Sequence, residues 1–79
     1  MKRVLQERRI ELGMTQQALA EKSGIPITVI RGFEQGVRNI NRAQIDTIVH
    51  LCYALALRPS EVLDDKNLQK MCKEIEEYE

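Results

Sequence analysis

The chain has 79 residues, of which twelve are acidic, twelve are basic and none is tryptophan. This length allows one small hydrophobic core, and the balanced charge is unlike that of a polybasic tail. A content of 43% hydrophobic and 30% charged residues indicates a soluble globular domain rather than a disordered chain. A core of this size is marginal, so stabilisation by a dimer interface is expected and catalysis on a large substrate is disfavoured.

The whole chain is predicted to be helical, with short connections marked by glycine or polar residues. The hydroxyl of Thr15 is suited to cap a helix, and Pro26 is suited to the first turn of another. Gly13, Gly24 and Gly36 can take the left-handed conformation that ends a helix. The expected helices cover residues 2–12, 16–22, 26–35 and 45–55, a short segment that opens at 58–61, and residues 64–79.

Apolar residues at helical spacing indicate which faces are buried. The second and third helices are expected to bury the angle between them, and the fourth is expected to be a buried element with Val49 beside its stripe. The residues predicted to face the core are Leu5, Leu12, Leu19, Ile25, Ile30, Phe33, Ile45, Ile48, Cys52 and Leu55.

The last segment, residues 64–79, carries a narrow apolar stripe formed by Leu68, Met71, Ile75 and Tyr78. Three interpretations remain open for it. The stripe can fold back on the domain, it can pair with a second copy of the chain, or the segment can be a solvated and partly frayed helix.

The net charge of zero conceals an asymmetry. Residues 1–63 hold nine bases and six acids, whereas residues 64–79 hold three bases and six acids. The body therefore carries +3 and the tail −3. This pattern fits a basic binding face with an acidic appendage, and it also fits ordinary surface scatter.

Residues 15–34 have the spacing of a helix-turn-helix. The small side chain of Ala20 allows two helices to approach closely, and Gly24 tolerates the positive φ that a tight turn needs. Around this unit, the pattern G-x-T-Q-x-x-L-A-x-x-x-G-I over residues 13–25 is followed by E-x-G-x-R-N over residues 34–39. Together with residues 54–63, these motifs closely resemble the phage Cro/C1-repressor-like (Xre-type) helix-turn-helix domain over residues 3–63.

The resemblance implies an all-α, five-helix, lambda-repressor-like DNA-binding domain over residues 1–63. The apolar stripe and the charge of residues 64–79 predict an acidic helical extension after it. The resemblance also implies that the helix over residues 26–35 enters the major groove of double-stranded DNA. The phosphate backbone would be contacted at the start of the second helix and after the third. The residues expected there are Gln16, Gln17, Arg38, Asn39 and Arg42.

Base readout is where the chain departs from the family, whose early recognition-helix positions are usually polar. Ile27 could pack on a thymine methyl group, Thr28 could hydrogen-bond a base or a phosphate, and Arg31 is the one long donor. Gly32 either allows another group to approach this helix closely or is a poorly optimised helix position. Alternatives without a DNA contact also remain open, namely that Gln16 is only a good helix former and that Arg38 and Arg42 are solvated surface charges.

Two further features follow from the resemblance. Arg9 and Glu34 match positions that pair in this family, so a partly buried, structural ion pair is expected. The connection over residues 39–47 is about three residues longer than the family pattern and lacks its proline. The fourth helix is therefore expected to begin earlier, near Asn41 or Arg42.

The resulting hypothesis is a cytoplasmic transcriptional regulator that binds DNA as a homodimer, with no membrane segment, metal or cofactor. Cys52 and Cys72 are expected to be free thiols, and His50 has too few neighbours of metal-binding type. The sequence shows no nucleophile, general base and orienting acid at a spacing typical of a catalytic site, so an enzyme is not expected. The alternative is a protein-interaction module on the same fold, such as an antitoxin, that uses Ile27, Val29 and the stripe of the tail.

Overall fold

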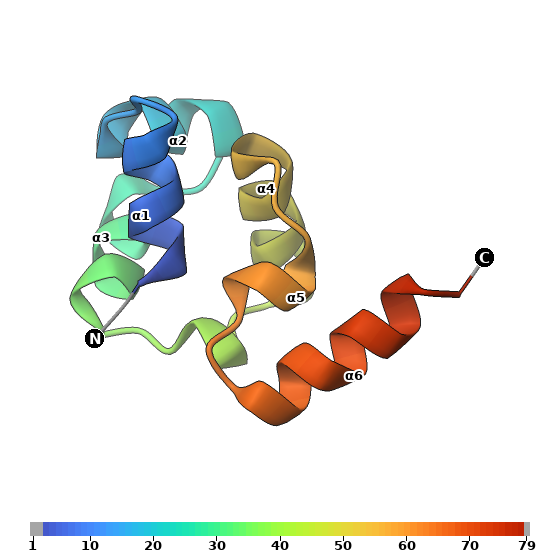
Figure 1. The fold of residues 1–79 in the computed structure, drawn as a ribbon. Coiled ribbons are helices and arrows are strands. Elements are labelled where there is room, and N and C mark those ends of the chain that lie inside the picture. Colours follow the sequence, from blue (N-terminus) through green and yellow to red (C-terminus); the bar gives the residue numbers. More distant parts are fainter. Residues whose placement is uncertain (1–2, 79) are drawn as a thin grey trace.

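The computed structural model describes residues 3–78, and over these residues every regular element is a helix and no strand occurs (Figure 1). The all-α class is therefore confirmed, with a six-helix order that includes the C-terminal extension. The elements are α1 (Val4–Glu11), α2 (Gln16–Ser23), α3 (Ile27–Gln35), the 3₁₀ turn η1 (Ile40–Arg42), α4 (Ile45–Leu55), α5 (Pro59–Val62) and α6 (Lys66–Glu76).

The ends of α2 show why the chain turns here. The hydroxyl of Thr15 accepts a hydrogen bond from the backbone N–H of Ala18 at 3.0 Å, which satisfies one of the free donors of the first turn. At the other end Gly24 has φ 74°, a conformation that costs a residue with a Cβ atom and that turns the chain into α3. Both features agree with the sequence prediction.

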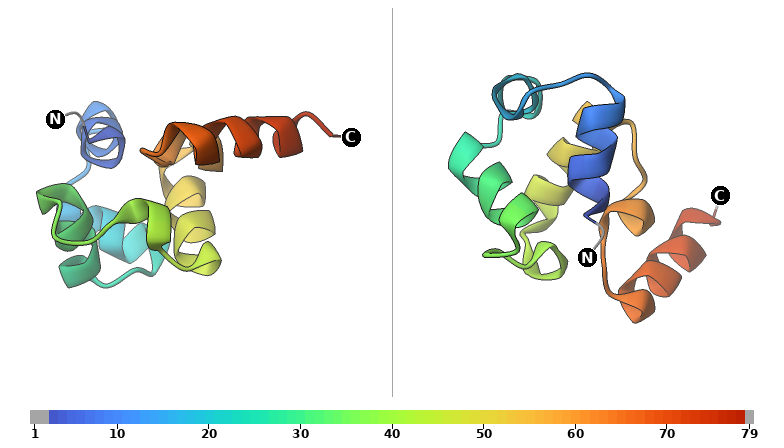
Figure 2. Two further views of the ribbon diagram at one scale, coloured as in Figure 1. Left: turned by 90° about the horizontal axis from the view of Figure 1, so that it is seen from below. Right: turned by 60° about the vertical axis from the view of Figure 1, so that its left-hand side comes forward.

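The core lies between the first five helices, with α1 crossing in front of α3 and α4 closing the far side (Figures 1 and 2). Its fully buried large side chains are Leu19, Ile30, Leu51, Leu55 and Val62. Leu5 belongs to this core, but Leu12 is exposed, contrary to the prediction. The reason is that α1 ends at Glu11, so Leu12 lies in the turn before Gly13 and no longer on the face of Leu5.

The start of α4 was predicted wrongly, because the helix begins at Ile45 and not near Asn41 or Arg42. Residues 40–42 form the separate turn η1, and the extended backbone at Ala43 and Gln44 prevents that turn from joining α4.

The burial of one side of α4 was also predicted wrongly. Ile45 and Val49 are exposed, together with Tyr53, whereas Ile48, Leu51 and Leu55 are buried. The spacing of four residues places Ile45, Val49 and Tyr53 on one outward face of the helix. The apolar content of α4 therefore covers two faces, of which the core uses one.

Helix α6 packs against α5 and then projects from the body (Figures 1 and 2). Leu68 and Cys72 pack on the core, and the carboxylate of Glu76 accepts hydrogen bonds from the backbone N–H and the hydroxyl of Ser60, at 3.1 and 2.8 Å. The predicted stripe is thus divided. Its first residue is partly buried, and the other three, Met71, Ile75 and Tyr78, are exposed.

The remaining residues of chemical interest are the two cysteines and the potential metal ligands. Cys52 and Cys72 are free, and burial, reinforced by the nearby Glu76 and Glu61 carboxylates, raises the pKa of the Cys52 thiol to about 11. Over residues 3–78, no cluster of three metal-binding side chains occurs. In the same part of the chain, no helix has the length and apolar character needed to cross a membrane.

Candidate nucleic-acid interface

Helix α3 divides cleanly into a buried and an exposed side. Ile30 and Phe33 point into the core, while Thr28, Arg31 and Gln35 are exposed. Their spacing of three and four residues places these three polar side chains on one outer face. Gln35 was not singled out from the sequence, although its position four residues after Arg31 is the signal that would have found it.

Ile27 and Val29 frame this face and are less accessible than the sequence suggested. Both are half-buried, and Val29 packs against the core. The outer surface of α3 is consequently polar at its centre, with Ile27 as an apolar border.

Arg9 and Glu34 form a buried, two-pronged ion pair that ties α1 to α3. The Nε and Nη2 atoms of Arg9 donate to the carboxylate of Glu34 at 2.8 and 3.0 Å, and Nη1 donates to the carbonyl of Met14 at 2.8 Å. The side chain of Glu34 is only 2% exposed and that of Arg9 is 12% exposed. Burying either charge without the other would cost several kcal/mol of stability, so the two side chains are expected to remain paired in the folded state.

The side chain of Gln16 links this ion pair to the outer face of α3. Its Nε2 atom donates to Glu34 at 3.0 Å, and its Oε1 atom accepts from the Nε atom of Arg31 at 3.2 Å. Gln16 is also the first residue of α2, where backbone N–H groups are free to bind an anion. One continuous chain of hydrogen bonds therefore runs from Arg9 through Glu34 and Gln16 to Arg31. The neighbouring Gln17 is exposed and makes a separate hydrogen bond, in which it donates to Glu21 at 3.3 Å.

Gly32 was predicted, among the DNA-contacting residues, to be either a point of close approach or a poorly optimised helix position. It is buried, because the side chain of Arg38 lies across α3 at this point. A Cβ atom at Gly32 would come within 2.8 Å of Cδ and 2.9 Å of Cγ of Arg38. The absence of a side chain at Gly32 thus makes room for an arginine, which is the physical reason for a glycine inside this helix.

Arg38 also lines a groove between the end of α3 and the start of α4. The groove has a volume of about 530 Å³, and its walls carry the basic side chains of Arg38 and Arg42. Asn39 lines it as well, but its side-chain oxygen accepts from the backbone N–H and the side-chain amide of Asn41, both at 3.0 Å. The other lining residues are Val29, Phe33, Ala43, Gln44 and Thr47.

Replacing Gly32 by alanine should separate the stability of α3 from the position of Arg38. Alanine favours a helix interior by about 1 kcal/mol over glycine, so thermal unfolding should not occur at a lower temperature. Affinity for duplex DNA should nevertheless fall several-fold, because Cβ displaces Arg38. Circular dichroism and fluorescence anisotropy measure the two effects. In an Arg38→Ala background the same substitution should leave affinity unchanged, and a further loss there would contradict this interpretation.

Two short helices joined at a left-handed glycine, with a polar face left exposed on the second, define the helix-turn-helix class of DNA-binding domain. Comparison with protein families agrees, since a family model described as helix-turn-helix matches residues 5–52. The chain therefore belongs to the Cro/C1-type helix-turn-helix family. Comparisons with curated proteins and with solved structures gave no match.

Proposed function

We propose that the protein is a cytoplasmic transcriptional regulator that binds double-stranded DNA as a homodimer and inserts α3 into the major groove. The observation that carries this proposal is the exposed polar face of Thr28, Arg31 and Gln35, because the core occupies the opposite side of the same helix. A helix presented in this way fits the width of the major groove.

Cationic and amide groups lie on both sides of this face. The start of α2, with Gln16, stands at one side, and the groove with Arg38 and Arg42 stands at the other. We assign these groups to the phosphate backbone, since they flank the helix and Arg38 and Arg42 are exposed. Ile27, at the border of the face, is placed to contact a thymine methyl group.

The alternative of a protein-interaction module receives less support from α3. That alternative needs Ile27 and Val29 as an exposed apolar surface, but both are half-buried and Val29 packs on the core.

Binding to labelled duplex DNA should weaken strongly with salt. If Arg38 and Arg42 each displace a counterion, the association constant of one protomer should fall about tenfold between roughly 50 and 200 mM salt. Arg42→Ala should reduce the slope of log K against log salt by about one. Fluorescence anisotropy titrations at several salt concentrations measure both quantities.

Lys22→Ala is the matched control, because Lys22 is an exposed base at the end of α2 remote from Gln16. It should leave the slope nearly unchanged. No binding at low salt, or an affinity independent of salt, would overturn the proposed function.

A further inference from the structure

The groove between the end of α3 and the start of α4 has a part that DNA binding does not use. Phosphate groups would contact its two arginines, and a phosphate needs no apolar surface. The groove nevertheless has an apolar floor made by Val29, Phe33 and Ala43, which belong to the core or pack against it. Val29 and Ala43 are only half-buried, so part of their surface remains open to the groove.

The size and composition of the groove are those of a small-molecule site. Its volume of about 530 Å³ lies within the range of roughly 300–1,000 Å³ that is usual for ligand pockets. Such pockets combine an apolar lining with a few polar groups that orient the ligand. Besides the two guanidinium groups, the polar groups here are the amides of Asn39 and Gln44 and the hydroxyl of Thr47.

The backbone on both sides of the groove is fixed by hydrogen bonds. The N–H groups of Val37 and Arg38 both donate to the carbonyl of Gly32, at 2.9 and 3.0 Å, which closes the end of α3. In the turn η1, the N–H of Arg42 donates to the carbonyl of Asn39 at 3.0 Å. A ligand that enters a site formed in advance loses less free energy to ordering of the protein.

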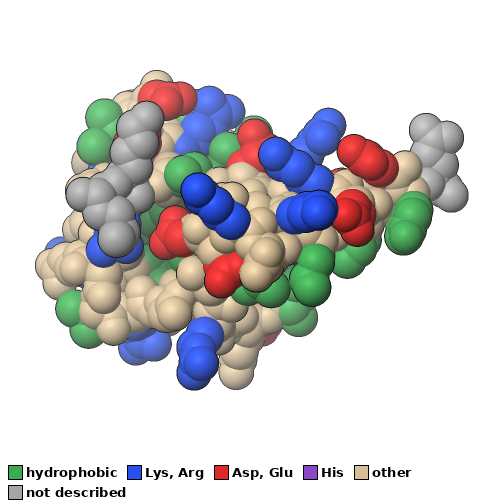
Figure 3. Space-filling model, turned by 60° about the horizontal axis from the view of Figure 1, so that its bottom comes forward, with side chains coloured by type: hydrophobic (Ala, Val, Ile, Leu, Met, Phe, Trp, Pro, Cys, Tyr) green, Lys and Arg blue, Asp and Glu red, His purple; other side chains and the backbone are tan. Residues whose placement is uncertain are grey.

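The charge of the groove selects an anion. Among the described residues that line it, only Arg38 and Arg42 are charged. Within residues 3–78 the ion pairs are formed by Arg3, Arg8 and Arg9, so neither groove arginine has a carboxylate partner there. In Figure 3 basic side chains stand at the lower edge of the molecule, where the left view of Figure 2 places α3 and the start of α4, and acidic side chains gather around α6.

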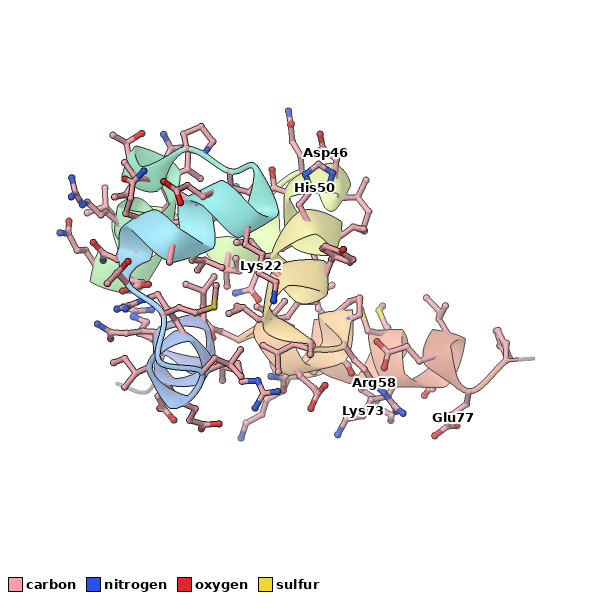
Figure 4. The ribbon with its side chains drawn as sticks, turned by 90° about the horizontal axis from the view of Figure 1, so that it is seen from above. Lys22, Asp46, His50, Arg58, Lys73 and Glu77 are labelled. Atoms are coloured by element: carbon pink, nitrogen blue, oxygen red, sulfur yellow. The ribbon has the colours of Figure 1, made fainter. Side chains whose placement is uncertain are left out.

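The two acids that adjoin the lining residues in the sequence are both engaged elsewhere. Glu34 is buried in its ion pair with Arg9. The carboxylate of Asp46 accepts a hydrogen bond from the backbone N–H of Thr47 at 2.8 Å and does not line the groove. Figure 4 shows Asp46 beside His50 on one side of α4, as their spacing of four residues requires. The two arginines are therefore available to a ligand.

From the apolar floor and the two unpaired arginines we infer that the groove is a binding site for a small aromatic carboxylate. The planar forks of Arg38 and Arg42 match the geometry of a carboxylate. The ring of the ligand lies on the floor, where Phe33 favours an aromatic body because aromatic pairs gain more than their area alone provides.

Binding of such a ligand excludes DNA from the same two arginines. The site therefore makes release from DNA responsive to a small molecule, although the chain has no separate effector domain over residues 3–78. This competition rests on the proposed function, whereas binding of the carboxylate does not.

Titration of the isotope-labelled full chain with naphthoate, followed by heteronuclear NMR, tests the binding. Saturable shifts should be largest at the backbone amides of residues 29–33 and 38–47. The dissociation constant should be about 1 mM or lower, as is usual for a ligand of this size. Naphthylmethanol keeps the ring without the charge, and acetate keeps the charge without the ring. Each should bind at least about tenfold more weakly, because one of the two sets of contacts is missing.

Substitutions in the groove test which residues hold the carboxylate. Arg42→Ala should weaken the binding of naphthoate about tenfold or more, because it removes a charge-assisted hydrogen bond. Thr47→Glu should weaken it as well, since it places a negative charge in the groove. Lys22→Ala is the matched control, because Lys22 is an exposed base on α2 that does not line the groove. It should leave the dissociation constant of naphthoate unchanged.

The ligand titrations have clear opposing outcomes. No saturable shift up to tens of millimolar naphthoate would overturn the inference. Shifts centred away from the groove would also overturn it. The same holds for equal binding of naphthylmethanol, because apolar adsorption needs neither arginine.

Competition is measured by fluorescence anisotropy with a labelled duplex. Naphthoate at about ten times its own dissociation constant should raise the apparent dissociation constant of DNA about tenfold per protomer, as mass action requires for mutually exclusive ligands. Sodium acetate at the same concentration controls for ionic strength and should have a much smaller effect.

The NMR titrations contain no DNA, so the two experiments separate this inference from the proposed function. Naphthoate bound in the groove of a protein that binds no DNA would overturn only the proposed function. Salt-dependent DNA binding by a protein that does not bind naphthoate would overturn only the ligand site. DNA binding that saturating naphthoate does not weaken would overturn the competition.

Discussion

Glu34→Ala should lower the free energy of unfolding by about 3 kcal/mol, because it leaves the guanidinium of Arg9 buried without its partner. The amide of Gln16 loses an acceptor in the same substitution. For a domain of this size the melting temperature should fall by roughly 12–24 °C. Thermal unfolding followed by circular dichroism measures the change.

The exposed pair of Arg8 and Glu11, at 3.3 Å, provides the control. Glu11→Ala should alter stability by less than about 1 kcal/mol, since exposed ion pairs contribute little. A double variant, Arg9→Met with Glu34→Leu, should be more stable than either single variant, because no buried charge remains unpaired. Unchanged melting temperatures for both Arg9→Met and Glu34→Ala would show that the pair has no structural role.

Arg31→Ala should reduce the affinity for a preferred DNA sequence by about 10- to 100-fold, the effect of losing one bidentate contact to a base. The preferred sequence is obtained first, by selection from a random pool with the wild-type protein. Affinity for a scrambled duplex should change only a few-fold, because phosphate contacts remain. The measured quantity is the ratio of the two affinities.

Gln16→Ala extends this experiment to the residue that holds Arg31. The hydrogen bond from Arg31 to Gln16 restricts the arginine, so its loss should reduce the same ratio by a smaller factor. Lys22→Ala, which removes an exposed charge elsewhere on α2, should leave the ratio unchanged. An equal loss on both duplexes for Arg31→Ala would reassign Arg31 to the phosphate backbone.

Much of the fold was predictable because its signals are local. Thr15 caps the helix that follows it, and Gly24 supplies the positive φ of the turn, whatever the rest of the chain does. The pairing of Arg9 with Glu34 was accessible through family resemblance, since two residues 25 positions apart carry no local signal for contact.

The parts that were missed depend on tertiary structure. The passage of Arg38 over Gly32 is a property of side-chain packing, and a sequence shows only an unfavourable glycine in a helix. The exposure of Ile45 and Val49 was missed for a related reason. A periodic apolar stripe looks the same whether it packs on its own domain or on another molecule.

The side-chain oxygen of Asn41 accepts hydrogen bonds from the backbone N–H groups of Asp64 and Asp65, at 2.8 and 2.9 Å. Asn41 belongs to the same 3₁₀ turn as Arg42, and Asp65 caps the first turn of α6. The side-chain amide of Asn41 therefore connects the turn that carries Arg42 to the first turn of α6. If the protein binds DNA as the proposed homodimer, we expect this connection to limit the movement of the two α3 helices relative to each other and to narrow the range of distances tolerated between half-sites on DNA.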